Sequence, residues 1–209
     1  TSRLIKEYYG AEYQKFIEGS CGIYAAVNTY LYLSGNNHIF TVDSVQELLK
    51  EYLRMTGSTQ DWIERNWSHG DGIVSICKFL QNKLSSRGCN AIWWDVEDAV
   101  ASTLDMYACY NKIKSILKQD IPVIMALYRE DGARLRFYYQ NGNTLTQGGW
   151  ADEHYWVVTG VYENPACPDK HFLEVSTWGR KMYICYEEFF YGRGGKTTFS
   201  TIMDIKFKK

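Results

Sequence analysis

Apolar residues recur at helical spacing through the first half of the chain. The segment that starts at Cys21 is largely apolar and stops before Gly35, a residue type that commonly ends helices. Ser44-Val45-Gln46-Glu47 has the capping-box pattern, and the apolar residues after it return every three or four positions. The helices predicted in this half cover about 21–33, from 44 onward, 73–84 and 104–117, with a short strand predicted over 91–94.

The second half has the pattern of strands. Pro122 precedes a continuous apolar run, and Asn141-Gly142-Asn143 is typical of a turn. The predicted strands cover 123–128, 135–139, 154–162, 172–176, 182–185 and 198–205. Helices followed by strands indicate an α+β fold. We therefore expect one domain, 1–209, with a helical lobe over about 1–118 and a β lobe over about 119–209.

Composition and charge narrow the class of protein. Hydrophobic residues make up 45% and charged residues 22%, the balance of a folded globular chain. The 24 acidic and 23 basic residues leave a net charge of −1, without the basic excess of a nucleic-acid binder. No apolar run is long enough to span a membrane. Thr1 is compatible with a removed signal or tag, so secreted and cytoplasmic locations both stay open, as does the oligomeric state.

The six cysteines show no C-x-x-C spacing, which argues against a zinc site or a redox motif. We predict no metal and no cofactor. Cys21, within Gly19-Ser20-Cys21-Gly22, falls at the start of a predicted helix. Free N–H groups and the positive end of the helix dipole favour a thiolate there, so we expect a lowered pKa and the fastest alkylation of the six thiols. The alternative for Cys21 is a small buried hydrophobic residue.

A cysteine nucleophile needs a histidine that exchanges protons with it. His154 begins a strongly apolar strand, and the next predicted strand ends in Ser176-Thr177-Trp178-Gly179. Together with Cys21-Gly22 and the stretch Ile116 to Ile124, this order of motifs resembles the papain-like cysteine peptidase superfamily. The closest branch is similar to the peptidases that process double-glycine leaders of bacteriocins, and to their stand-alone bacterial relatives.

The resemblance implies a papain-like cleft between the lobes, with a peptide or protein substrate. It implies that Cys21 is the nucleophile, that His154 is the general base and acid, and that Gln14 contributes to the oxyanion hole. Where the family has Asn or Asp as third catalytic residue, this chain has Ser176. A serine hydroxyl orients an imidazole more weakly than a carboxylate, so Glu174 and Asp152 remain alternative third residues, and a degenerate, non-catalytic relative remains open.

Three other functions stay open at this stage. An acyltransferase or transamidase would use the same nucleophile and base, with an amine in place of water. A virulence effector or toxin acting on a host protein is a further candidate. A binding module for peptide or carbohydrate would use exposed aromatic residues, for which the candidates are 92–94, 137–139 and 189–191. His69 in a glycine-rich loop, with no ligand spacing, is interpreted as part of a surface turn.

Overall fold

Eight antiparallel strands from both halves of the chain form one sheet in the computed structural model, which describes residues 21–35, 42–57, 71–95, 106–129, 134–191 and 197–208. The strands are β1 (Cys89–Asp95), β2 (Val123–Arg129), β3 (Leu135–Asn141), β4 (Thr144–Ala151), β5 (Glu153–Glu163), β6 (His171–Thr177), β7 (Arg180–Cys185) and β8 (Thr197–Phe207). Their order across the sheet is β1-β8-β2-β5-β6-β7-β3-β4. β1, from the helical half of the sequence, therefore belongs to the same sheet as the strands of the second half.

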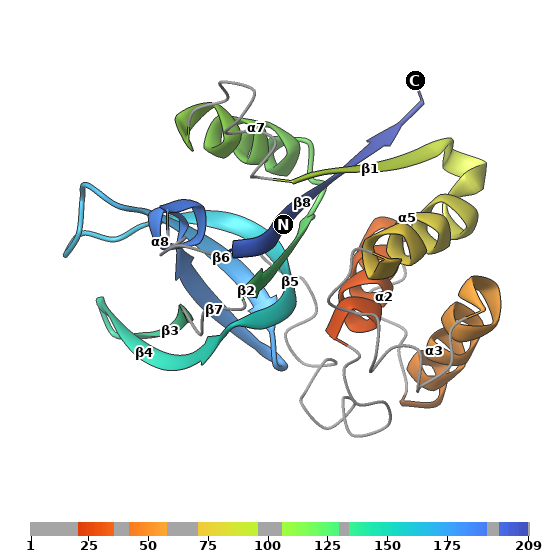
Figure 1. Cartoon of the computed structure of the whole chain (residues 1–209), viewed down its shortest axis with the longest axis horizontal. Coiled ribbons are helices and arrows are strands. Elements are labelled where there is room, and N and C mark those ends of the chain that lie inside the picture. Colours follow the sequence, from red (N-terminus) through yellow and green to blue (C-terminus); the bar gives the residue numbers. More distant parts are fainter. Residues whose placement is uncertain are drawn as a thin grey trace.

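The helices of the described residues are α2 (Cys21–Leu33), α3 (Val42–Thr56), α5 (Asp71–Lys83), α7 (Met106–Lys118) and the short α8 (Tyr186–Tyr191), with a 3₁₀ turn over Ser85–Arg87. α2 packs against β5 and α5, and α5 packs against β1. Figure 1 shows α2, α3 and α5 grouped together, with α7 and α8 away from them. The mixed helix and antiparallel-sheet architecture is the predicted α+β class.

Opposite faces of β5 meet different helices. The Tyr155 ring lies against Gly22 of α2, where an added Cβ would come within 3.4 Å of it. The next residue, Trp156, meets Phe189 of α8 edge-on, with ring centroids 5.8 Å apart. Successive side chains of a strand point to opposite faces. The side chain of His154 therefore projects to the Trp156 face, and that of Tyr155 to the α2 face.

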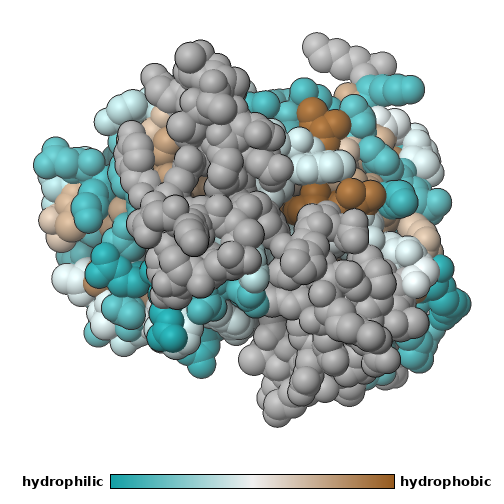
Figure 2. All heavy atoms as spheres, viewed as in Figure 1, coloured by the Kyte–Doolittle hydropathy of each residue, from teal (hydrophilic) through white to brown (hydrophobic). Residues whose placement is uncertain are grey.

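One hydrophobic cluster joins the helices to the sheet. Val27 of α2, Phe79 of α5 and Ile202 of β8 are all completely buried members of it. Residues 123–127 of β2 are also buried on both faces, which explains why their sequence is continuously apolar rather than alternating. Hydrophilic residues cover much of the described surface on the face shown in Figure 2, and hydrophobic residues form only small areas there.

The predicted helices and strands are present to within a few residues at each end. The turn expected at 141–143 connects β3 to β4, and Gly35 follows α2 with a φ of +73°. Two elements were not predicted, β4 and α8. β4 contains Gly148-Gly149, residues that strands disfavour, and the six residues of α8 are rich in the aromatic residues typical of strands.

Candidate active site

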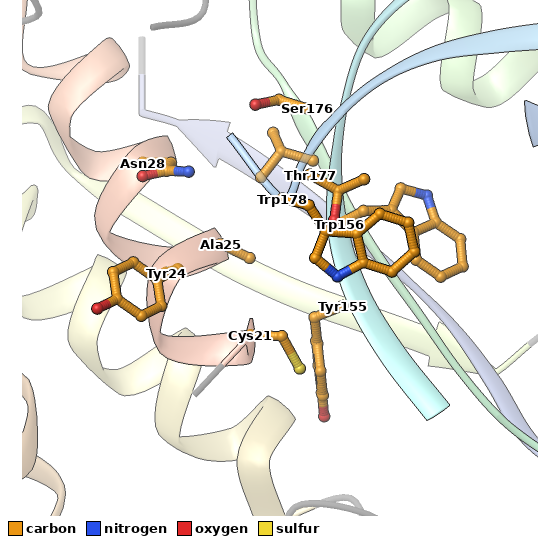
Figure 3. A pocket seen from close by; sticks show the side chains of 10 residues that line it. Cys21, Tyr24, Ala25, Asn28, Tyr155, Trp156, Ser176, Thr177 and Trp178 are labelled. Carbon is orange, nitrogen blue, oxygen red and sulfur yellow. The ribbon is translucent and has the colours of Figure 1, made fainter. Parts of the chain in front are cut away.

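Cys21 is the first residue of α2, as the sequence predicts. The residue is partly buried against the hydrophobic cluster, and its sulfur is directed toward Tyr155 of β5 (Figure 3). Three backbone N–H groups, those of Tyr155, Gly22 and Cys21 itself, hydrogen-bond to the sulfur. A thiol thus lies at a helix start, beside the backbone of the residue that follows His154.

The electrostatics of this thiol differ from the expectation. Burial raises the pKa of Cys21 to about 11, the three N–H groups lower it, and the negative charge of Glu153 raises it further. The helix-start effect is therefore present, but desolvation of the thiolate outweighs it. The prediction of a lowered pKa was wrong, because the sequence places the cysteine at a helix start but does not show how deeply the sulfur is desolvated.

His154 is only 5% exposed on β5. Its Nε2 lies 2.5 Å from the Oγ1 of Thr177, the last residue of β6. The ring of Trp178 stacks on the imidazole, with centroids 4.7 Å apart and planes inclined by 18°. Burial lowers the pKa of His154 to about 3, so the imidazole is neutral at physiological pH. When Nε2 donates its proton to Thr177, Nδ1 carries the free lone pair.

Trp178 is held in a strained turn. β6 and β7 are joined by the two residues Trp178 and Gly179, whose φ angles are +47° and +68°. Positive φ at both loop residues is the signature of a type I′ hairpin, and for a tryptophan it costs roughly 1–2 kcal/mol. The indole also contacts Phe137 at 4.9 Å between centroids, and Gly149 of β4 leaves room for it. Packing on both sides of the ring supports this conformation.

A small pocket of about 20 Å³ lies beside Cys21 and is lined by residues of α2, β5 and β6. Asn28, two turns after Cys21 on α2, lines it and is 5% exposed (Figure 3). Its Oδ1 has no hydrogen-bond partner among the described residues. His154 does not line this pocket, although Tyr155, Thr177 and Trp178 do. The pocket thus has room for about one water molecule, and the Cys21 thiol and the unpaired Asn28 Oδ1 lie at its wall.

Thr177, and not Ser176, makes the contact with His154 that was expected of Ser176. The hydrogen bond to His154 is made by Thr177, whereas Ser176, which pairs with Val157, projects to the opposite face of β6 and lines the pocket. The predicted contact between Ser176 and His154 was therefore wrong, and Thr177 makes this contact instead. The sequence did not reveal it because the choice between two adjacent hydroxyls depends on which face of the strand each one occupies.

The other candidate residues have different surroundings. Glu174 accepts a hydrogen bond from Thr159 at 2.8 Å and pairs with Lys181 at 3.3 Å. Asp152 is partly exposed. Burial raises the pKa of Glu153, and the negative charge of Asp152 raises it further. No hydrogen bond joins either carboxylate to His154 within the described part of the chain. Gln14 and His69 lie outside the described residues.

The aromatic segments considered for ligand binding are divided between surface and core. Trp93 and Tyr139 are exposed, at 43% and 42%. Phe137, Phe189 and Phe190 are buried in the core. Trp94 and Tyr138 are half-buried, so the rings of these segments do not all face solvent.

Among the described residues, no three His, Cys, Asp or Glu side chains are grouped so that they could hold a metal ion. All six cysteines lie in the described segments and are free thiols. None of the helices described has the length and apolar character needed to cross a bilayer. Comparison with known proteins finds no matching family model, no matching curated protein and no matching solved structure.

Proposed function

We propose that this chain is a papain-like cysteine hydrolase that cleaves a peptide or amide bond through a thioester, with a cleft between its helices and its sheet. The observation that carries the proposal is the Cys21 thiol at the start of α2. The thiol meets the backbone of Tyr155, which directly follows a histidine hydrogen-bonded by Thr177 and covered by Trp178. A nucleophile, a proton acceptor and a group that orients the acceptor are the parts that such a reaction needs.

The protonation states determine how the reaction starts. Cys21 is a thiol and His154 a neutral imidazole at neutral pH. In the proposed reaction His154 accepts the thiol proton as the sulfur attacks the carbonyl carbon, rather than after an ion pair has formed. This step requires the imidazole to turn toward Cys21, because in the structure it lies on the Trp156 face of β5, beside Thr177 and Trp178. The carbonyl π electrons move to oxygen, and collapse of this intermediate expels the amine, which takes the proton from His154. Water then attacks the thioester, again losing a proton to His154, which returns it to the sulfur as the acid leaves.

Two groups suit the substrate's polar atoms. The backbone N–H of Cys21 lies beside the sulfur and would donate to the oxygen that gains charge. The Asn28 Oδ1 in the pocket, which has no partner among the described residues, would accept a hydrogen bond from a substrate backbone N–H. In this proposal Thr177 is the positioning residue, and Gln14 is a second oxyanion-hole donor by resemblance.

Hydrolysis of quenched peptide amides and labelled casein tests the proposal. We expect cleavage by the wild type and its loss, by at least about a thousandfold, in Cys21→Ala and in His154→Gln. Cys167→Ser, a partly exposed cysteine outside the pocket, is the matched control and should retain the wild-type rate. Undiminished cleavage by Cys21→Ala would exclude the mechanism. An amide product formed only with an added primary amine would indicate the transferase alternative.

A non-catalytic binding module is the second candidate, and two observations favour it. The pKa of Cys21 is raised by burial, and His154 does not line the Cys21 pocket. A module would bind peptides without cleaving them, and Cys21→Ala would bind as tightly as the wild type. Binding measured by fluorescence anisotropy, combined with unchanged peptide mass after long incubation, would favour the module over the hydrolase.

A further inference from the structure

A second, larger pocket lies at the far end of β5 from His154. It has a volume of about 560 Å³ and is bounded by α7 and by the connection between β5 and β6. The lining side chains of most interest are Tyr107, Tyr110 and Lys114 of α7, and Tyr162, Lys170 and His171 from the other wall. This volume is within the range of small-molecule sites.

His171 is held in a fixed orientation at one wall of this pocket. Its Nδ1 lies 2.6 Å from Glu187 Oε1 of α8, and its backbone N–H donates to the same carboxylate. The Tyr110 and Tyr107 rings contact the imidazole, with centroids 4.5 and 5.6 Å away. With Nδ1 committed to Glu187, Nε2 is the nitrogen left for a ligand. A carboxylate behind a histidine is a common arrangement at sites where the other nitrogen has a function.

The two lysines that line the pocket have no carboxylate partner among the described residues. Lys170 forms no ion pair with a described residue, and the Lys114 ammonium lies 5.4 Å from the centre of the Tyr110 ring. Glu163 is the one carboxylate among the described residues that line this pocket. Two ammonium groups and an imidazole therefore surround a space that tyrosine rings also border. Tyr107 is the most accessible of these rings, at 56% exposed.

We propose that this pocket binds a nucleoside monophosphate. Lysine is a common phosphate ligand, and Lys114 and Lys170, which line this pocket, would donate to the phosphate. His171, held by Glu187 through Nδ1, presents Nε2 to the same space. Tyr107 provides a face on which a base stacks, because every base has a π face. Glu163 and Asn111, which line the same pocket, are suited to accept and donate hydrogen bonds to ribose hydroxyls.

Titration calorimetry and amide NMR with AMP, adenosine, ribose 5-phosphate and inorganic phosphate test this assignment. We expect AMP to bind, and each of the other three to bind at least about tenfold more weakly, since each lacks the base or the phosphate. NMR shifts should be confined to α7 and to residues 162–171. Absence of AMP saturation at about 10 mM, shifts located elsewhere, or equal binding of any of the other three would overturn the proposal.

Variants separate the two parts of the site. The double variant Lys114→Met and Lys170→Met should weaken AMP by about tenfold or more and leave adenosine unchanged. Tyr107→Leu should weaken AMP and leave ribose 5-phosphate unchanged. Lys112→Met is the matched control, because Lys112 lies on the same helix with its ammonium over Trp94, outside the pocket. Equal loss in Lys112→Met would overturn the assignment. Cys21→Ala should bind AMP as the wild type does, so the result is independent of the proposed catalysis.

Discussion

Cys21 combines three N–H donors with a thiol that keeps its proton. The donors alone would favour the thiolate, but the surrounding protein removes water from the sulfur, and solvation by water stabilises a charge more than three amide dipoles do. The chemistry available to this residue at neutral pH thus depends on a neighbouring base that accepts the proton during attack.

Alkylation of Cys21 is therefore expected to be slow at neutral pH. Its rate with iodoacetamide should rise about tenfold per pH unit from pH 7 to 10, because the thiolate forms only near the pKa of about 11. N-acetylcysteine, with an ordinary pKa, is the reference and should react faster at pH 7. Mass spectrometry of the labelled protein measures the rate. A plateau at or below pH 8 would contradict the raised pKa.

Thr177 is expected to position His154 for catalysis. Removal of its hydroxyl in Thr177→Val should lower kcat by about tenfold, the equivalent of roughly 1.4 kcal/mol for one neutral hydrogen bond, with KM nearly unchanged. Thr177→Ser should restore the rate. Ser176→Ala, one residue away on the opposite face, is the control.

The pH profile distinguishes positioning from a general structural defect in Thr177→Val. Its acidic limb should move, because the imidazole is freed from its partner, whereas the profile of Ser176→Ala should match the wild type. A larger loss of activity in Ser176→Ala than in Thr177→Val would reverse the assignment.

At the scale of elements, β4 makes room for the Trp178 ring, because Gly149 has no side chain at the point where the ring approaches the strand. A Cβ on Gly149 would lie 3.2 Å from the Trp178 ring, closer than packed side chains usually approach. Glycine is a poor strand residue in general, so its presence here follows from the close approach of the ring.

Gly149→Ala is expected to lower the free energy of unfolding by about 1–3 kcal/mol and to reduce activity, because Trp178 is displaced from His154. Urea titration followed by tryptophan fluorescence measures the first effect, and peptide hydrolysis the second. The matched control is Gly160→Ala on β5, where the new Cβ would meet Glu174 at an ordinary 3.6 Å. Equal losses in both variants would show that the Trp178 contact is not the cause.

Local sequence signals predicted α2 and most of the strands, because their apolar spacing and bounding glycines act over a few residues. β4 contains two glycines, and the close approach of the Trp178 ring to Gly149 comes from another hairpin, so this contact has no local signal in the sequence. The pairing of Thr177 with His154 likewise depends on how β6 aligns with β5, and this register contains a bulge between Val158 and Gly160. Cys21 and His154 could be selected from the sequence, but their desolvation could not.

At the scale of the whole molecule, the neutral state of His154 links pH to stability. An unfolded chain binds a proton at this histidine near its ordinary pKa of about 6.5, whereas the folded chain does so only near 3. Between these values the unfolded state holds more protons. The contribution of His154 to the free energy of unfolding is therefore fully present above pH 6.5 and is lost as the pH drops toward 3.

Urea unfolding at pH 7 and pH 5 tests this linkage. The wild type should lose about 2 kcal/mol from this histidine alone between the two pH values. In His154→Gln the free energy of unfolding should fall by about 2 kcal/mol less between pH 7 and pH 5 than in the wild type, because glutamine binds no proton. An identical pH dependence in both proteins would mean that His154 titrates normally in the folded state.

The position of β8 has a consequence for the nascent chain. β8 pairs with β1 on one side and with β2 on the other. β1 precedes β8 by roughly a hundred residues in the sequence, so the ribosome makes β1 long before β8. At bacterial or eukaryotic translation speeds, a ribosome takes roughly 5 to 20 seconds to make that length. During this interval β1 has been made but the strand it pairs with has not. The time that the growing polypeptide waits for β8 is thus the period in which a trigger-factor-type chaperone would be most useful to it.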